Sequence, residues 1–377
     1  MTFGRAYCTT LKAALSDFGA LLLLVMAGIA YSFFYPLPYQ PEQVQQVTVM
    51  VVDLDHSSAS RQLTRFALAH PQLLVQQVTG ELAEAQDALW RGAIDGVLII
   101  PKDLRKNLLA GRRTSVQLVG NGAYFLLNRT VLSGLAEAAG TLSAGIDIRR
   151  LEAKGQSGAQ AAQTRAPLQF LSRPLFNVSE GYGSYVVPAV SILIVQQTLL
   201  IGMGLLFGSW AESGYRSAPA TRGFGAYLGM LAAFASIAFV NCLYFFGFVF
   251  WFQDYPRGGN LGGMLLFAAL FCCMVAACGA LIGSFFKERE QALAVLLFTA
   301  LPMLFLTGFS WPLEALPWPL SWLRLALPST PGIQGLLALN QMGASLHEVR
   351  TELAHCTALL AIALALGYAR WRVLARR

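Results

Sequence analysis

Long apolar stretches without a single Asp, Glu, Lys or Arg constrain this chain more than any other feature. There are six of them, covering residues 18–36, 184–208, 224–252, 261–286, 291–310 and 353–369. A helix crosses the roughly 30 Å hydrocarbon core of a bilayer with about 20 residues, and about 17 suffice. Inside lipid the backbone must satisfy its own hydrogen bonds, which a helix achieves. The sequence therefore predicts an α-helical polytopic membrane protein with six transmembrane helices.

Charged residues are few and unevenly distributed. They make up 12% of the 377 residues, about half of the roughly 25% typical of a soluble domain, which excludes an ordinary soluble enzyme. Residues 37–182 contain 14 of the 27 Lys and Arg and 12 of the 20 Asp and Glu. Because a charge in hydrocarbon is costly, this range is predicted to form one polar domain outside the lipid.

Net charge and cysteine positions exclude further classes of protein. The chain carries +7, but residues 37–182 contribute only +2 of it, so the excess lies beside the membrane and no nucleic acid is expected as a partner. All six cysteines lie outside that range. A secreted disulfide scaffold is therefore excluded.

Lys and Arg in the short flanks of the apolar stretches predict the orientation. With the N-terminus inside, the cytoplasmic flanks hold Arg5, Lys12, Arg216, Arg222, Lys287, Arg289, Arg370, Arg372, Arg376 and Arg377, and the outer flanks hold only Arg257, Arg324 and Arg350. Positive residues collect on the cytoplasmic side, so both termini are predicted to be cytoplasmic and the polar domain extracytoplasmic. A signal peptide cleaved near Gly28 and Ala30 is the alternative for the first stretch, and it gives the same orientation.

The first 17 residues have an amphipathic pattern. Phe3, Tyr7, Leu11 and Leu15 recur every four residues, as on one face of a helix. We expect a helix that lies in the cytoplasmic interface of the membrane. A loose N-terminal tail is the alternative.

The polar domain alternates short apolar strands with helices. Strands are expected at 47–53, 73–78, 96–100 and 115–119, and helices at 58–69, 81–91 and 102–109. This alternation is typical of βαβ units, so a largely parallel sheet is predicted. An Ala-rich stretch from about 123 to 163 predicts one extended helix, with Gly155 and Gly158 weakening its end.

Asp53, Asp55 and His56 follow the first predicted strand and could suggest a metal site. Strand-end Asp followed by Ser57 and Ser58 is better interpreted as the turn and N-cap of the next helix. No metal or other cofactor is expected. The chain also has no phosphate-binding loop of the form GxxxxGK[ST], so any ATP must be bound by another chain.

Several motifs resemble the membrane subunits, or permeases, of ABC-2-type exporters, in the branch with a large domain between the first and second helices. They are YPLPY at 35–39, VVDLDHS at 51–57, RGAIDGV at 91–97 before Ile100 and Pro101, LFN at 175–177 and TGFSWPLEALP at 307–317. The resemblance covers nearly the whole chain. Two segments depart from the pattern: 210–216 keeps one acid and one base of a segment usually rich in both, and 121–123 lacks the usual acidic residue.

The resemblance implies partners. Such permeases pair as homodimers or heterodimers, bind two cytosolic ABC ATPase subunits and move amphiphilic or hydrophobic molecules outward. Relatives with the outer domain work beside a periplasmic adaptor protein. By this resemblance the chain would reside in the bacterial inner membrane, in contact with lipid.

Charged residues in two predicted cytoplasmic loops are the candidates for ATPase docking. They are Glu212, Arg216, Lys287, Glu288 and Arg289. A solvated turn is the alternative for 287–290. The C-terminal arginines are interpreted as anchors for lipid headgroups.

A few polar residues inside the apolar stretches are candidates for a substrate path. They are Gln196, Gln197, Asn241, Thr299 and Thr307. Intramembrane polar groups face other helices or a cavity, so hydrogen bonding between helices is the alternative. Gly204 with Gly208, and Gly279 with Gly283, fit small-residue helix packing.

Residues 310–350 contain five prolines and are too broken to span the membrane. Trp311, Trp318 and Trp322 suit a membrane interface. We expect an outer lid over the exit, with an inert surface loop as the alternative.

The sequence thus predicts an interfacial helix at 1–17, transmembrane helix 1 at 18–36, an extracytoplasmic α/β domain at 37–182 and transmembrane helices 2–6 within 183–377. The expected function is that of an ABC exporter permease without its own ATPase site. A membrane-anchored sensor is one alternative, although the inner loops are too short for a signalling domain. A secondary transporter is the other, although internal repeats and buried ionisable residues are not evident.

Overall fold

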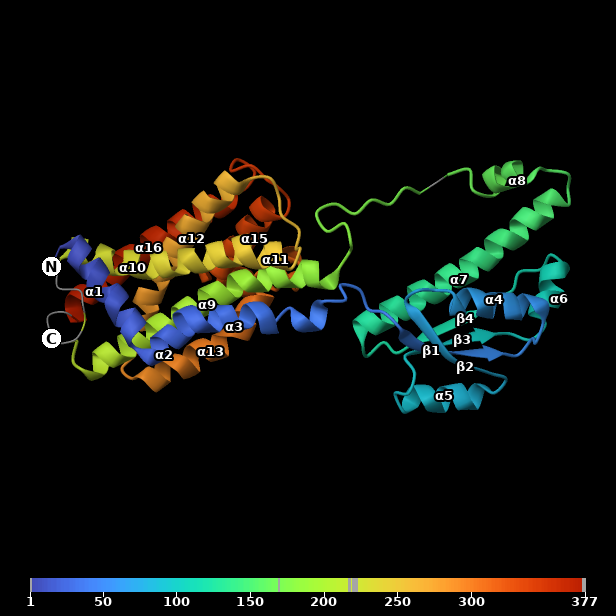
Figure 1. The fold of residues 1–377 in the computed structure, drawn as a ribbon, viewed down its shortest axis with the longest axis horizontal. Helices are drawn as coiled ribbons and strands as arrows, with labels where there is room; N and C mark the ends of the chain where they lie inside the picture. Colours follow the sequence, from blue (N-terminus) through green and yellow to red (C-terminus); the bar gives the residue numbers. More distant parts are fainter. Residues whose placement is uncertain (1, 169, 216–217, 219–222, 375–377) are drawn as a thin grey trace. The chain divides into compact units, whose positions relative to one another are not determined.

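The chain divides into two compact units (Figure 1). The computed structural model describes residues 2–168, 170–215, 218 and 223–374. The first unit comprises Met1–Glu42 and Pro174–Arg377, and the second comprises Gln43–Arg173. The second unit lies within the range 37–182 that the sequence predicts as a polar domain.

The first unit is a bundle of helices. It contains α1 (Phe3–Ser16), α2 (Phe18–Leu21), η1 (Leu22–Met26), α3 (Ala27–Phe34), η2 (Leu37–Tyr39), α9 (Tyr182–Glu212), α10 (Phe224–Leu243), η3 (Tyr244–Val249), α11 (Phe250–Phe252), α12 (Leu261–Gly283), α13 (Arg289–Phe305), η4 (Leu313–Ala315), α14 (Trp318–Leu323), η5 (Arg324–Ala326), α15 (Ser329–Asn340) and α16 (Arg350–Leu374). We call the end where α1 begins and α16 ends the termini end. α3 ends and α9 begins at the opposite end (Figure 1).

Five helices among the described residues are long and apolar enough to cross a membrane. They are Phe18–Tyr39, Tyr182–Glu212, Phe224–Phe252, Leu261–Gly283 and Arg350–Leu374. They coincide with five of the six predicted stretches. The remaining stretch, 291–310, falls on α13, which has only 17 residues. The sixth crossing therefore stays a prediction.

α1 forms as the sequence predicts, but its apolar stripe is only partly packed against the bundle, and the fully buried face carries small side chains. The buried residues are Ala6, Thr10 and Ala14. These small side chains let α1 approach α10 closely, and the Tyr7 hydroxyl lies 3.0 Å from the Ser236 hydroxyl. The larger Phe3 and Leu15 stay exposed.

The second unit is built on a four-stranded sheet with the order β2-β1-β3-β4. The strands are β1 (Val47–Asp53), β2 (Leu73–Thr79), β3 (Gly96–Ile100) and β4 (Gln117–Gly120), and the helices are α4 (Ser58–Leu68), α5 (Leu82–Trp90), α6 (Leu104–Leu109), α7 (Phe125–Glu152) and α8 (Gly158–Arg165). β1 pairs in parallel with β2 and β3, whereas β4 is antiparallel to β3. α4 and α7 cover one face and α5 the other (Figure 1).

The predicted single helix from 123 to 163 is wrong in one respect, because the chain forms two helices. α7 ends at Glu152 and α8 begins at Gly158. Gly155 lies between them with φ +93, a left-handed conformation that favours glycine. Ser157 then caps α8 by accepting a hydrogen bond from the Gln160 amide.

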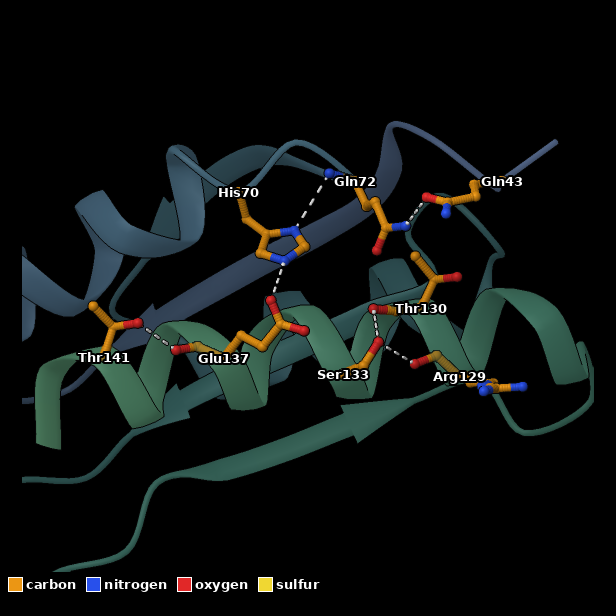
Figure 2. A network of polar contacts seen from close by, with 8 residues as sticks. All are labelled: Gln43, His70, Gln72, Arg129, Thr130, Ser133, Glu137 and Thr141. Carbon is orange, nitrogen blue, oxygen red and sulfur yellow. Dashed lines mark hydrogen bonds and ion pairs between the residues drawn. The ribbon is translucent and has the colours of Figure 1, made fainter. Parts of the chain in front are cut away.

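A histidine fixes α7 against the loop that follows α4 (Figure 2). His70 Nδ1 accepts a hydrogen bond from the Gln72 amide at 3.3 Å, so Nε2 carries the proton and lies 3.2 Å from Glu137 Oε2. A Cβ on Gly134 would lie 3.0 Å from the His70 ring. The absence of a side chain at Gly134 therefore makes room for this contact.

The capping interpretation of Asp53 is confirmed. Asp53 Oδ1 accepts hydrogen bonds from the amides of Asp55 and His56, and Oδ2 accepts one from the Ser60 hydroxyl. Ser57 caps α4. Among the described residues no group of three or more His, Cys, Asp or Glu side chains could hold a metal ion.

Candidate functional site

Three charged residues meet at the termini end of the bundle. Arg289, the first residue of α13, donates to both carboxylate oxygens of Asp17, with distances of 2.6 and 2.8 Å. The Arg289 amide donates to Glu212 Oε1 at 2.9 Å. We call Asp17, Glu212 and Arg289 the ion-pair cluster. It joins the end of α1, the end of α9 and the start of α13.

The Asp17–Arg289 pair is partly shielded from water, whereas Glu212 is exposed. The side chains of Asp17 and Arg289 are 23% and 32% exposed. The hydrogen bonds from Arg289 hold the pKa of Asp17 below its usual value, while the hydrogen bond from Asp17 raises the pKa of Arg289. Asp17 also accepts the Ala20 amide and so caps α2. One carboxylate therefore fixes both a helix start and an ion pair.

The five predicted docking residues have different environments. Glu212 and Arg289 form the intramolecular contacts just described. Lys287 and Glu288 are exposed beside them, as is Glu290. Arg216 lies outside the described residues. The turn before α13 thus offers the accessible charges, while Glu212 and Arg289 hold this turn on α9.

α13 runs antiparallel to the C-terminal part of α9. Near the termini end, Gly208 of α9 leaves room for the backbone of Glu288, which a Cβ there would approach to 2.7 Å. One turn further, a Cβ on Gly204 would lie 2.8 Å from Leu296. The small-residue packing expected at these two glycines is confirmed.

The two glutamines of the predicted substrate path lie between α9 and α13. Gln197 donates to the Leu296 carbonyl at 3.3 Å, and Gln196 approaches the Met303 sulfur at 3.4 Å. Both side chains are buried, and neither amide oxygen has a hydrogen-bond partner among the described residues. A buried acceptor without a partner is costly. The α9–α13 contact is therefore polar and incompletely satisfied.

Asn241 of α10 bonds to a π-helical turn of the first span. Its side chain donates to the Leu24 carbonyl in η1 at 2.7 Å. η3 begins three residues after it, at Tyr244, whose hydroxyl lies 2.9 Å from the Ser32 hydroxyl. Because π-helical turns expose carbonyls that an α-helix would use, the Asn241 amide satisfies one of them.

The two threonines of the predicted path bond within their own segment. Thr299 donates to the Leu296 carbonyl and Thr307 to the Leu304 carbonyl. The Thr307 carbonyl accepts a hydrogen bond from Gln334 of α15 at 2.8 Å. Gln197 and Thr299 thus share the Leu296 carbonyl, and the role of the five residues as a substrate path stays a prediction.

The opposite end of α9 is held by neutral donors and aromatic rings. Rings follow one another with centroid spacings of 4.5 to 6.3 Å, and we call them the aromatic chain: Tyr35, Tyr39, Tyr182, Tyr185 and Phe309. The Tyr185 hydroxyl donates to the Phe309 carbonyl. Glu42 accepts hydrogen bonds from the amide and hydroxyl of Ser184, at 3.0 and 2.9 Å.

A cavity of about 620 Å³ lies at this end of the first unit. Its lining combines aromatic rings with carboxylates, as in Phe33, Phe252, Tyr255, Glu42 and Asp254. The size is typical of small-molecule sites, which span about 300–1,000 Å³.

The predicted lid at 310–350 has two different parts. Trp311, Trp318 and Trp322 are 57%, 77% and 70% exposed. α15, by contrast, is buried against α9 and α12, with ring atoms of Phe271 and Phe267 occupying the space beside Gly332 and Gly335. Residues 329–340 are therefore part of the bundle core. The lid over the exit stays a prediction.

Sequence reasoning missed Asp17 and Glu42. Asp17 is the only acidic residue before the first apolar stretch, and that isolation next to Lys- and Arg-rich flanks was a usable signal. Glu42 had no such signal, because its partner Ser184 is 142 residues away.

Comparison with known families is informative over most of the chain. Residues 18–369 match the family described as "ABC-2 family transporter protein". No curated protein matches the chain.

Proposed function

We propose that this chain, which belongs to the ABC-2 family of transporter proteins, is the membrane subunit of an ATP-driven exporter. As a member of that family it is a multi-pass membrane permease that associates with ABC ATPase subunits. It moves amphiphilic or hydrophobic compounds outward across the bacterial inner membrane. The observation that carries this proposal is the antiparallel α9–α13 pair, which is polar along its interior and bound by the ion-pair cluster at one end.

The pair also supports a six-helix topology. α9 is a candidate span, and α13 follows it from Glu212 at the termini end to Gln196, where Met303 lies beside it. At 1.5 Å per residue the 17 residues of α13 extend about 25 Å, and residues 306–309 continue toward Tyr185. In this topology both termini are cytoplasmic and the second unit is extracytoplasmic.

The ATPase subunits are supplied by another chain and dock at the termini end. Lys287 and Glu288 are the exposed contacts there, and the ion-pair cluster transmits movement of this turn to α1 and α9. The chain has no nucleotide hydrolysis of its own. It works with a second permease protomer, identical or different, and a periplasmic adaptor is a further partner.

Reconstitution tests the assignment. The chain is purified with the ATPase that accompanies it from its native membrane and placed in proteoliposomes. We expect ATP hydrolysis only when both chains are present, and none from the permease alone. Hydrolysis by the single purified chain would overturn the proposal.

Charge reversal tests the docking surface in the same assay. Lys287→Glu combined with Glu288→Lys should reduce ATPase copurification and hydrolysis about tenfold or more, since rim and interface charges set association. Arg257→Glu, at the opposite end, is the matched control and should change neither. Equal effects of the two variants would place the docking surface elsewhere.

Orientation is tested by cysteine labelling after Cys8 and Cys273, the two exposed cysteines, are replaced by alanine. A membrane-impermeant maleimide should label Lys102→Cys from outside the cell and Lys287→Cys only after the membrane is opened. The reverse pattern would contradict the topology.

A further inference from the structure

A second cavity, of about 330 Å³, lies entirely within the second unit. It is enclosed by α4, α6, α7 and the segment 111–116. Its floor is apolar, because Leu63, Leu104 and Leu142 are buried there. Leu108, Val116 and Ile146 form further apolar walls. The volume is within the range of about 300–1,000 Å³ common for small-molecule sites.

The rim of this cavity is cationic. Arg112, Arg113 and Arg150 line it together with one acid, Asp147. Asp147 is already paired with Arg165 of α8 at 3.9 Å, and Arg150 donates to the Leu108 carbonyl. The side chains of Arg112 and Arg113 make no hydrogen bond or ion pair within the part of the chain that the structure describes. Arg112 and Arg113 are exposed, so the lining of the cavity contains two unpaired cations besides its apolar floor.

We propose that this cavity is a binding site for an amphiphilic anion, a molecule with an apolar body and a carboxylate or sulfate head. The body occupies the space between Leu63, Leu104 and Leu142, and the head lies at Arg112 and Arg113. Guanidinium groups present planar pairs of donors that match carboxylate and sulfate oxygens. The unpaired positive charge disfavours an amphiphilic cation, and the apolar floor disfavours a small inorganic anion.

The site is independent of the direction of transport and of ATPase docking. It would give the second unit a recognition role of its own. Its test accordingly needs neither ATP nor transport, so that its failure and that of the exporter proposal are distinguishable.

Hydrogen exchange on the full chain in lipid nanodiscs tests the site, with octyl sulfate as the probe. We expect slower exchange in peptides covering 104–116 and 139–150. Octanol and octyltrimethylammonium, which share the tail but lack the negative charge, should give no such protection. Protection by all three compounds would show membrane or apolar partitioning only and would overturn the proposal, as would no protection by octyl sulfate.

Two double variants assign the head-group contact. Arg112→Gln with Arg113→Gln should weaken octyl sulfate binding roughly tenfold or more, since bidentate charge-assisted bonds are lost. Arg65→Gln with Arg129→Gln removes the same charge from exposed positions outside the cavity and should leave binding unchanged. Unchanged exchange in the β1 and β3 peptides verifies folding of each variant. Equal binding by both variants would overturn the role of the arginines.

Discussion

The two ends of the α9–α13 pair are joined by different chemistry. At the termini end the Arg289 guanidinium pairs with Asp17, and the Glu212 carboxylate of α9 accepts a hydrogen bond from the Arg289 backbone amide. At the opposite end the contact consists of the aromatic chain and the hydroxyl of Tyr185 on the Phe309 carbonyl. Ionic contacts respond to salt, pH and charge reversal, whereas ring packing does not. Solution conditions and a charged partner can therefore weaken the contact at Arg289, whereas the Tyr185–Phe309 contact does not depend on them.

The largest effect on stability is expected at the termini end, where the backbones of α9 and α13 approach each other closely. Gly208→Leu would push α13 away from α9, because a Cβ there meets the Glu288 backbone at 2.7 Å. We expect the free energy of unfolding to fall by about 1–3 kcal/mol, the usual cost of overpacking, as measured by denaturant unfolding in mixed micelles. Gly225→Leu, with no atom within 4 Å of its Cβ, should be neutral. A stable Gly208→Leu chain would mean that α13 does not hold this position.

Removal of the central charge is the next largest change. Arg289→Met keeps the length of the side chain but leaves Asp17 unpaired. We expect the free energy of unfolding to fall by about 1–2 kcal/mol. This is less than the roughly 1.5–3 kcal/mol of a charge-assisted hydrogen bond, because the pair is partly exposed. ATP hydrolysis in proteoliposomes should also lose its stimulation by the permease. Arg5→Met at the same end is the control. Normal stimulation in Arg289→Met would show that the ion-pair cluster does not transmit movement.

The pH dependence sharpens the contrast between the two ends. Because the folded-state pKa of Asp17 is lowered, its contribution to stability is present above the unfolded-state value of about 3.9 and is lost as the pH falls through the folded value. The difference in stability between wild type and Asp17→Asn should thus be constant near neutral pH and shrink below about pH 4. Unfolding curves across this range measure it. A difference that persists undiminished in acid would contradict the ionic origin.

The sequence predicted the elements better than the contacts between them. Apolar runs and the alternation of strands and helices depend on local pattern, so five spans and the strands of the second unit lie where expected. The burial of the helix at 329–340 was not predicted, because it depends on Gly332 and Gly335 meeting the rings of Phe271 and Phe267, a long-range fit that no local pattern encodes.

For the candidate site, too, the sequence predicted individual residues better than the contacts between them. Glu212 and Arg289 were chosen as charges in cytoplasmic loops, which local pattern supports, but their mutual contact spans 77 residues. Gln196 and Gln197 were identified from polarity alone, and only the structure places α13 over them. The partner of a polar residue in a helical membrane protein is set by helix packing, and single-sequence patterns do not specify that packing.

The smallest expected effect lies at the contact between Tyr185 and Phe309, which involves no charged side chain. Tyr185→Phe removes the hydroxyl that donates to the Phe309 carbonyl but keeps the ring, which is stacked on Phe309 with centroids 4.5 Å apart. We expect the free energy of unfolding to fall by about 0.5–1.5 kcal/mol, as for the loss of one neutral hydrogen bond, and this decrease should not depend on salt concentration. Tyr185→Leu removes the ring as well and serves as the matched comparison, with a larger loss. If Tyr185→Phe were as salt-sensitive as Arg289→Met, the two ends would not differ in kind, because a contact without charges has no counterions to screen it.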